Sequence, residues 1–121
     1  MPPSDPPDPL ARLMADARQH KHLSVLPSGA EPPLLLNLAL RTGDELAIGY
    51  AHLLAIEFDA CGRLTLHAAR HTVTLEGRNL RSLHTALVML RLAGVREVPE
   101  RDDGLPEKAT VVNAISVRRV S

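Results

Sequence analysis

Aliphatic residues alternate with polar or small residues through the middle of the chain, which predicts a core built mainly of β-strands. Residues 34–40 place a leucine at every even position, and residues 46–50 repeat the alternation after a short turn. Residues 53–58 continue it beyond a break at Ala51 and His52. The pattern therefore predicts strands in all three runs, the last two being either separate strands or one strand bent by a bulge.

The same alternation of apolar and polar residues predicts a hairpin, and composition predicts a strand near the end of the chain. Residues 59–62 have the composition of a hairpin turn, and they precede alternating runs at residues 64–67 and 72–76. Residues 110–120 are rich in valine and isoleucine, which predicts a final strand. Residues 95–98 are a candidate for one further short strand.

The N-terminal third predicts a leader, a helix and a linker. Residues 1–9 hold five prolines and two aspartates, a composition typical of a disordered segment. Residues 10–22 then carry apolar side chains at helical spacing, entered through Asp8 and Pro9 as cap and first-turn residues. Prolines and a glycine at residues 26–33 break both regular periods and predict a linker.

The clearest helical pattern begins at Asn79, a good N-cap residue, and ends at Gly94, which suits the left-handed position after a helix. The residues predicted to face the core from it are Leu80, Leu83, Leu87 and Leu90, with Ala86, Met89 and Ala93 beside them.

The order of these elements predicts a mainly β fold with helices, in the α+β class. We expect a small five- or six-stranded antiparallel barrel or roll, with an N-terminal helix and one helix after the central strands. Residues 10–121 are predicted to form a single domain, because a chain of 121 residues is too short for two.

Composition narrows the classes of function. The chain has 14 basic and 14 acidic residues, so no net charge draws it to nucleic acid or to an anionic membrane. Cys61, expected to lie exposed in a turn, is the only cysteine, and no apolar run is long enough to span a bilayer. These features predict a cytoplasmic protein. With one tyrosine and one phenylalanine the core is aliphatic, and a domain this small is expected to gain stability as a homo-oligomer.

Three segments, LALRTGDELAIGY, AIEFDACGRLTLH and TVTLEGRNLRSL, resemble the two-part signature of Sm-like proteins over about residues 38–83. That family consists of small five-stranded barrels that assemble into rings and bind RNA. The residues that carry the resemblance are Gly43 and Asp44, Gly49, Phe58 and Asp59, and the run from Glu76 to Leu80. The resemblance implies a barrel, a ring of identical subunits and RNA as a partner. A long helix after Leu80 departs from the family plan.

Four arginines and one asparagine near the second hairpin and the helix after it are the candidate contacts for RNA or another anion. They are Arg63, Arg70, Arg78, Asn79 and Arg81. Binding of single-stranded RNA also uses exposed aromatic rings, whereas Tyr50 and Phe58 have core-facing parity. The pattern favours the alternative, a solvent-exposed face on which the arginines pair with Glu57 and Glu76.

The six histidines raise a metal hypothesis. His67 and His71 are four residues apart but flank a predicted turn, and His20 and His22 point to different faces at a helix end. His84 lies beside the apolar stripe without a nucleophile near it in sequence. We interpret them as surface, turn or helix-edge residues, and we predict no catalytic residue, metal ligand or cofactor.

The leading hypothesis is a non-enzymatic binding or assembly module that self-associates, because strands that are apolar on both faces are hard to cover within so small a chain. Candidate edge strands are residues 34–40 and 110–120, with Leu35 and Val112 buried between subunits. One alternative is an Sm-like RNA-binding ring. Another is a small metal-dependent enzyme that uses the histidines.

Overall fold

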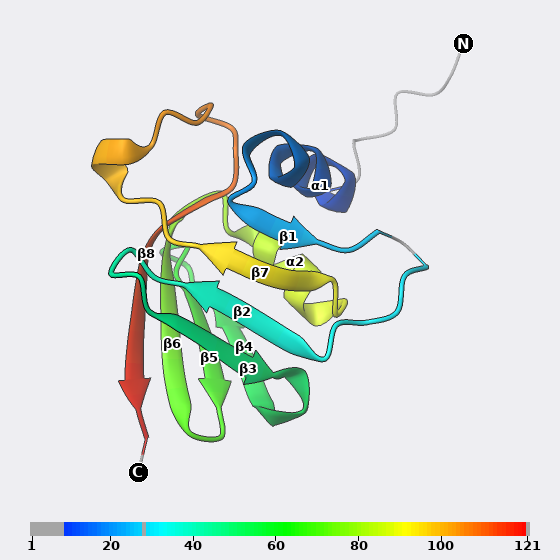
Figure 1. The fold of residues 1–121 in the computed structure, drawn as a ribbon, viewed down its shortest axis with the longest axis vertical. Coiled ribbons are helices and arrows are strands. Elements are labelled where there is room, and N and C mark those ends of the chain that lie inside the picture. Colours follow the sequence, from blue (N-terminus) through cyan, green and yellow to red (C-terminus); the bar gives the residue numbers. More distant parts are fainter. Residues whose placement is uncertain (1–8, 28, 121) are drawn as a thin grey trace.

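Two four-stranded sheets and two short helices make up the fold in the computed structural model, which describes residues 9–27 and 29–120 (Figure 1). The helices are α1 (Pro9–His20) and α2 (Arg81–Val88), and two 3₁₀ turns are η1 (Tyr50–His52) and η2 (Glu100–Asp102). The strands are β1 (Leu23–Val25), β2 (Leu35–Ala39), β3 (Glu45–Gly49), β4 (Leu53–Phe58), β5 (Leu64–Ala68), β6 (His71–Arg78), β7 (Leu92–Arg96) and β8 (Val111–Arg119). Residues 1–8 of the predicted leader lie outside the described residues.

The strand order is β1-β7-β2-β3 in the first sheet and β4-β5-β6-β8 in the second. Neighbouring strands are antiparallel except β2 and β7, which run parallel. The α+β class and both predicted helices are confirmed. The five- or six-stranded antiparallel barrel is wrong, because the described residues form eight strands in two open sheets. η1 carries the chain from β3, at the edge of one sheet, to β4, at the edge of the other.

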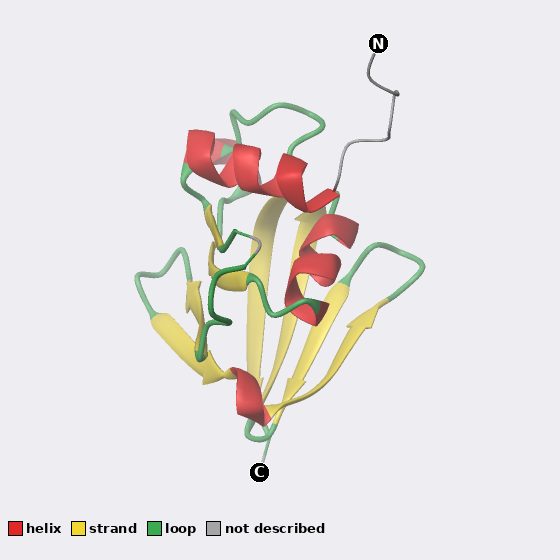
Figure 2. Ribbon diagram, turned by 90° about the vertical axis from the view of Figure 1, so that its right-hand side faces the viewer, coloured by secondary structure: helices red, strands yellow, loops and turns green. Residues whose placement is uncertain are grey.

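Alternation along the strands turns one leucine-rich face of each sheet into a shared core. Leu36 and Leu38 of β2 are fully buried, as are Leu64 and Leu66 of β5. Figure 2 shows α1 lying across one end of the sheets and α2 lying beside the strands. α1 packs on β1 and on α2, and α2 packs on β4, so the helices cover core surface that the open sheets leave. No helix among the described residues is long and apolar enough to cross a membrane.

The predicted helix over residues 79–94 is too long at both ends. Asn79 has a left-handed φ of 57° and lies outside α2, which lacks a side-chain cap. Leu90, also at φ 57°, takes the left-handed position expected of Gly94. Gly94 lies in β7 instead, together with the fully buried Leu92. This segment is a strand and not a helix because β1 and β2 both offer it hydrogen-bonding partners.

The two predicted edge strands have different outcomes. β8 is an edge strand, as predicted, whereas β2 lies inside its sheet between β7 and β3. Val112 is fully buried in the core of its own chain, so its predicted burial between subunits is wrong. Leu35 is about half exposed.

A buried carboxylate joins the two sheets. Glu97, directly after β7, is only 8% exposed. Its Oε1 accepts the N–H of Arg41 at 2.9 Å, and its Oε2 accepts the N–H of Ile115 at 3.1 Å. Arg41 follows β2 in the first sheet and Ile115 lies on β8 in the second, so one side chain fastens both. The structural role of Glu97 was not predicted, because in the sequence this residue begins a charged loop.

Candidate functional site

The predicted salt-bridged face exists on the outer side of the second sheet. Arg63 Nε lies 3.3 Å from Glu76 Oε1, and His67 Nε2 lies 2.8 Å from Glu57 Oε1. The predicted pairing of an arginine with Glu76 is therefore confirmed, whereas Glu57 pairs with His67 and not with an arginine. Because all four side chains are substantially exposed, these pairs contribute little to stability.

The remaining candidate anion contacts point in several directions. The guanidinium of Arg81 lies over the Phe58 ring, 4.9 Å from its centroid. The amide of Asn79 donates to the carbonyls of Glu107 and Ala109 in the loop before β8. Arg70 lies in the β5–β6 turn, at the opposite end of β5 from Arg63. The structure therefore does not bring the predicted contacts together on one surface. These contacts are Arg63, Arg70, Arg78, Asn79 and Arg81. RNA binding through them stays a prediction.

Arg78 is held in an ion pair with Asp103. Arg78 Nη2 lies 2.7 and 2.8 Å from the two carboxylate oxygens, and the Asn113 amide and the Leu105 N–H donate to the same group. Burial by itself raises the pKa of Asp103, but the bonds from Asn113 and Leu105 and the charge of Arg78 outweigh it and lower the pKa. The ionised carboxylate thereby fixes the loop between β7 and β8.

Replacing Asp103 with asparagine should lower the free energy of unfolding by about 1.5–3 kcal/mol at neutral pH, the usual contribution of a hydrogen bond to a charged group. A carboxyl group with a lowered folded-state pKa adds stability above its unfolded pKa and loses it as the pH falls through the folded value. The difference between wild type and D103N should therefore shrink below about pH 4.

Urea unfolding at a series of pH values measures this dependence. Glu76→Gln is the matched control, because its carboxylate is largely exposed and pairs with an exposed arginine. A stability difference for D103N that stays constant from neutral to acidic pH would contradict the assignment.

The histidines take separate structural roles. His22 is buried, with Nε2 2.6 Å from the carbonyl oxygen of Thr110, so its interpretation as a surface residue is wrong. His67 and His71 lie on opposite faces of the second sheet, since His67 faces outward beside Glu57 and His71 shares the parity of the core residues of β6. Within residues 9–27 and 29–120, no three His, Cys, Asp or Glu side chains gather in a way that could hold a metal ion.

His84 and Cys61 lie where the sequence predicts them. The His84 ring packs on Phe58 at 5.9 Å between centroids, at the edge of α2. Cys61 is exposed in the turn after β4, and its N–H donates to Asp59 Oδ1 at 2.9 Å.

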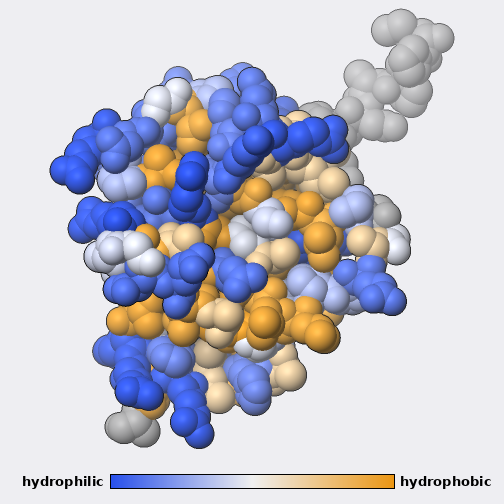
Figure 3. Space-filling model, viewed as in Figure 1, coloured by the Kyte–Doolittle hydropathy of each residue, from blue (hydrophilic) through white to orange (hydrophobic). Residues whose placement is uncertain are grey.

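Six large apolar side chains are exposed at the start of β2, on β4 and at the end of α2, and we call them the Tyr50 surface. They are Leu34, Leu35, Leu54, Val88, Met89 and Leu90. Leu34 and Leu54 are the most exposed, at 86% and 73%. Figure 3 shows hydrophobic residues running across the lower half of the view, over β2 and β3. Single exposed leucines are ordinary, whereas a monomer rarely exposes a large continuous apolar patch.

Tyr50 connects the segments that carry this surface. Its N–H donates to the Leu34 carbonyl at 3.0 Å, and its hydroxyl donates to the Leu92 carbonyl just beyond the end of α2. Burial raises the pKa of Tyr50 to about 12, so the hydroxyl remains a donor at any physiological pH. Leu54 lies on β4, four residues after Tyr50 and on the strand against which α2 packs.

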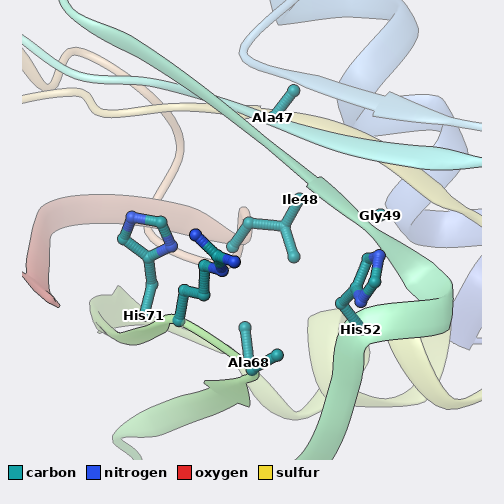
Figure 4. A pocket seen from close by; sticks show the side chains of 8 residues that line it. Ala47, Ile48, Gly49, His52, Ala68 and His71 are labelled. Atoms are coloured by element: carbon teal, nitrogen blue, oxygen red, sulfur yellow. The ribbon is translucent and has the colours of Figure 1, made fainter. Parts of the chain in front are cut away.

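A small cavity of about 160 Å³ opens between β3 and the β5–β6 turn, where the two sheets approach each other (Figure 4). Its floor is apolar, and its rim carries one arginine and two histidines. Ile48 and Ala68 are buried and form the floor, with the half-buried Gly49 beside them and the exposed Ala47 and Ala69 at the margin. The rim residues are His52, Arg70 and His71.

Backbone contacts fix the rim of this cavity. The N–H of Ala69 donates to the His52 carbonyl at 3.0 Å, which joins η1 to the β5–β6 turn. The N–H of Val120 donates to the Arg70 carbonyl at 2.9 Å. Gly49 leaves room for the His52 ring, since a β-carbon at Gly49 would lie 3.1 Å from His52 Cδ2.

One permanently charged side chain, the guanidinium of Arg70, lies at the cavity. No carboxylate lines it, and among the described residues the side chains of His52, Arg70 and His71 have neither a hydrogen bond nor an ion pair. His71 is the register partner of Arg119 on β8, which places a second arginine beside it. Arg70 is among the predicted anion contacts whereas His52 and His71 are not, because folding alone brings η1, the β5–β6 turn and β8 together.

No family model matches the chain, and neither a curated protein nor a solved structure shows significant similarity to it. The Sm-like resemblance therefore stays a prediction that rests on its short motifs. The fold, the Tyr50 surface and the cavity at Arg70 are the remaining basis for a function.

Proposed function

We propose that this chain is a non-enzymatic module that self-associates and buries the Tyr50 surface between two copies. The observation that carries the proposal is a group of large aliphatic side chains left exposed on segments that Tyr50 fixes in place. Full burial of one such side chain contributes about 1.5–3 kcal/mol, so covering several of them is a substantial driving force.

A second copy is the occupant that fits this surface. A two-fold interface brings the same patch of both copies together, so an apolar patch is complementary to itself and needs no matching charges. The chain has 14 basic and 14 acidic residues, and two copies therefore meet without net repulsion. Proteins of low net charge also associate more readily than highly charged ones.

The edge of β8 is a poorer interface. Glu97 already accepts the outward N–H of Ile115, and Val98 donates to the carbonyl of Val112. The rest of the edge ends in the exposed Arg118 and Arg119, a type of residue that discourages pairing between strand edges. The proposed interface therefore lies on the Tyr50 surface and not on the predicted edge strand.

The double variant Leu34→Glu/Leu54→Glu should weaken self-association at least about tenfold, equivalent to about 1.4 kcal/mol. Both side chains are highly exposed, so the substitutions should leave the fold intact, and each places like charges opposite one another in a two-fold interface. Sedimentation velocity over a concentration series measures the change.

Ala60→Glu/Ser116→Glu is the matched control, because it adds the same charge at exposed positions away from the Tyr50 surface. This control should associate as wild type does. A wild-type chain that stays monomeric at high micromolar concentration would overturn the proposal, and so would a double variant that associates like the control.

A further inference from the structure

The rim of the cavity between β3 and the β5–β6 turn holds Arg70, which has no acidic partner among the described residues. Elsewhere Arg63 has Glu76 and Arg78 has Asp103. Here Arg70 and His71 lie side by side in sequence, with Arg119 in register beside them, and no Asp or Glu lines the cavity. Like charges held together in this way are stabilised by a bound anion.

We propose that this cavity binds a small organic anion, a carboxylate carried on a compact apolar group. The site goes beyond self-association, since its residues are distinct from those of the Tyr50 surface. Arg70 supplies a planar guanidinium whose paired N–H groups match a carboxylate. His52 and His71 supply ring N–H donors from either side of Ile48, as the close view shows (Figure 4).

The floor of the cavity indicates the rest of the ligand. The buried Ile48 and Ala68 present methyl and methylene groups, which favour hydrocarbon and offer nothing to the oxygens of an inorganic anion. The volume of about 160 Å³ is close to that of a buried apolar cavity of roughly 150 Å³ that holds benzene. A ligand of about the size of benzoate therefore places its ring on the floor and its carboxylate at the rim.

Titration of the full chain with benzoate, followed by amide chemical shifts, tests the site. We expect saturable shifts confined to residues 47–52 and 68–71. Phosphate supplies the charge without the ring, and benzyl alcohol supplies the ring without the charge. Each should bind at least tenfold more weakly than benzoate. Equal affinity for phosphate or for benzyl alcohol would overturn the proposed ligand class, and shifts elsewhere would overturn the site.

Single-residue variants test whether Arg70 contacts the ligand directly. Arg70→Gln should weaken benzoate binding at least tenfold, while Arg63→Gln, an exposed arginine at the other end of β5, should leave it unchanged. Gly49→Ala should weaken binding several-fold by displacing the His52 ring, with little change in thermal stability. Unchanged affinity in R70Q, or an equal loss in R63Q, would contradict the assignment.

Discussion

Gly77→Ala should destabilise the protein by about 3 kcal/mol or more, at the upper end of what overpacking costs. A β-carbon at Gly77 would lie 1.9 Å from the carbonyl oxygen of Val111 and 2.9 Å from its carbonyl carbon. Both are backbone atoms of the neighbouring strand, so no side chain can turn aside to make room. β6 and β8 shift register next to Gly77, and the substitution forces this closely packed pair of strands apart.

Thermal and urea unfolding of G77A, compared with Gly104→Ala, measure the effect. An added β-carbon at Gly104 meets nothing within 4 Å, and its φ lies outside the left-handed region. G104A should therefore stay within about 0.5 kcal/mol of wild type. A G77A protein that unfolds at the same urea concentration as G104A would show that the strands do not pack as described.

Glu97→Ala should lower the free energy of unfolding by about 2–4 kcal/mol, because a hydrogen bond to a charged group contributes about 1.5–3 kcal/mol and a buried donor left unpaired adds a penalty. The variant takes away the acceptor of both the Arg41 and the Ile115 N–H. Glu97→Gln keeps one carbonyl oxygen and should lose about half as much.

Amide hydrogen exchange gives this prediction a local readout. Protection of the Ile115 and Arg41 amides should fall in E97A by more than protection of β5 amides, because only the first two lose their acceptor. Glu100→Ala, at an exposed position in η2, is the control and should change little. Equal stability of E97A and E100A would rule out the proposed fastening of the two sheets.

Local alternation predicts most strands of this fold. Residues 34–40, 46–50, 64–67 and 110–120 all lie in or overlap strands, because each buries one face and the period of two shows directly in the sequence. The break at Ala51 and His52 marks η1, where the chain leaves one sheet for the other. Nothing in that local pattern says whether strands on either side of a break share a sheet, and the barrel was wrong for that reason.

The first part of β7 lies within a segment whose sequence pattern predicts a helix, and only its end overlaps the strand predicted over residues 95–98. Residues from Leu80 to Gly94 hold many good helix formers, and the leucine spacing continues past Val88. The segment becomes a strand because β1 and β2 lie on either side of it, and this pairing depends on residues more than fifty positions away. Propensity within the segment carries no information about such partners.

In the candidate sites, too, local features could be predicted from the sequence whereas contacts between distant residues could not. The pairing of the exposed Arg63 with Glu76 followed from strand parity. The cavity at Arg70, the fastening role of Glu97 and the burial of His22 depend on residues far apart in the chain, such as His22 and Thr110. Only the folded arrangement of the sheets reveals them.

The place of β7 between β1 and β2 also bears on how the chain folds during synthesis. A ribosome releases β1 and β2 long before β7, and it releases β6 long before its partner β8. Neither sheet is complete until the last third of the polypeptide has emerged, so the nascent chain presents its leucine-rich faces to water throughout translation. Such non-local pairing slows folding and exposes the unfinished chain to aggregation and to chaperones.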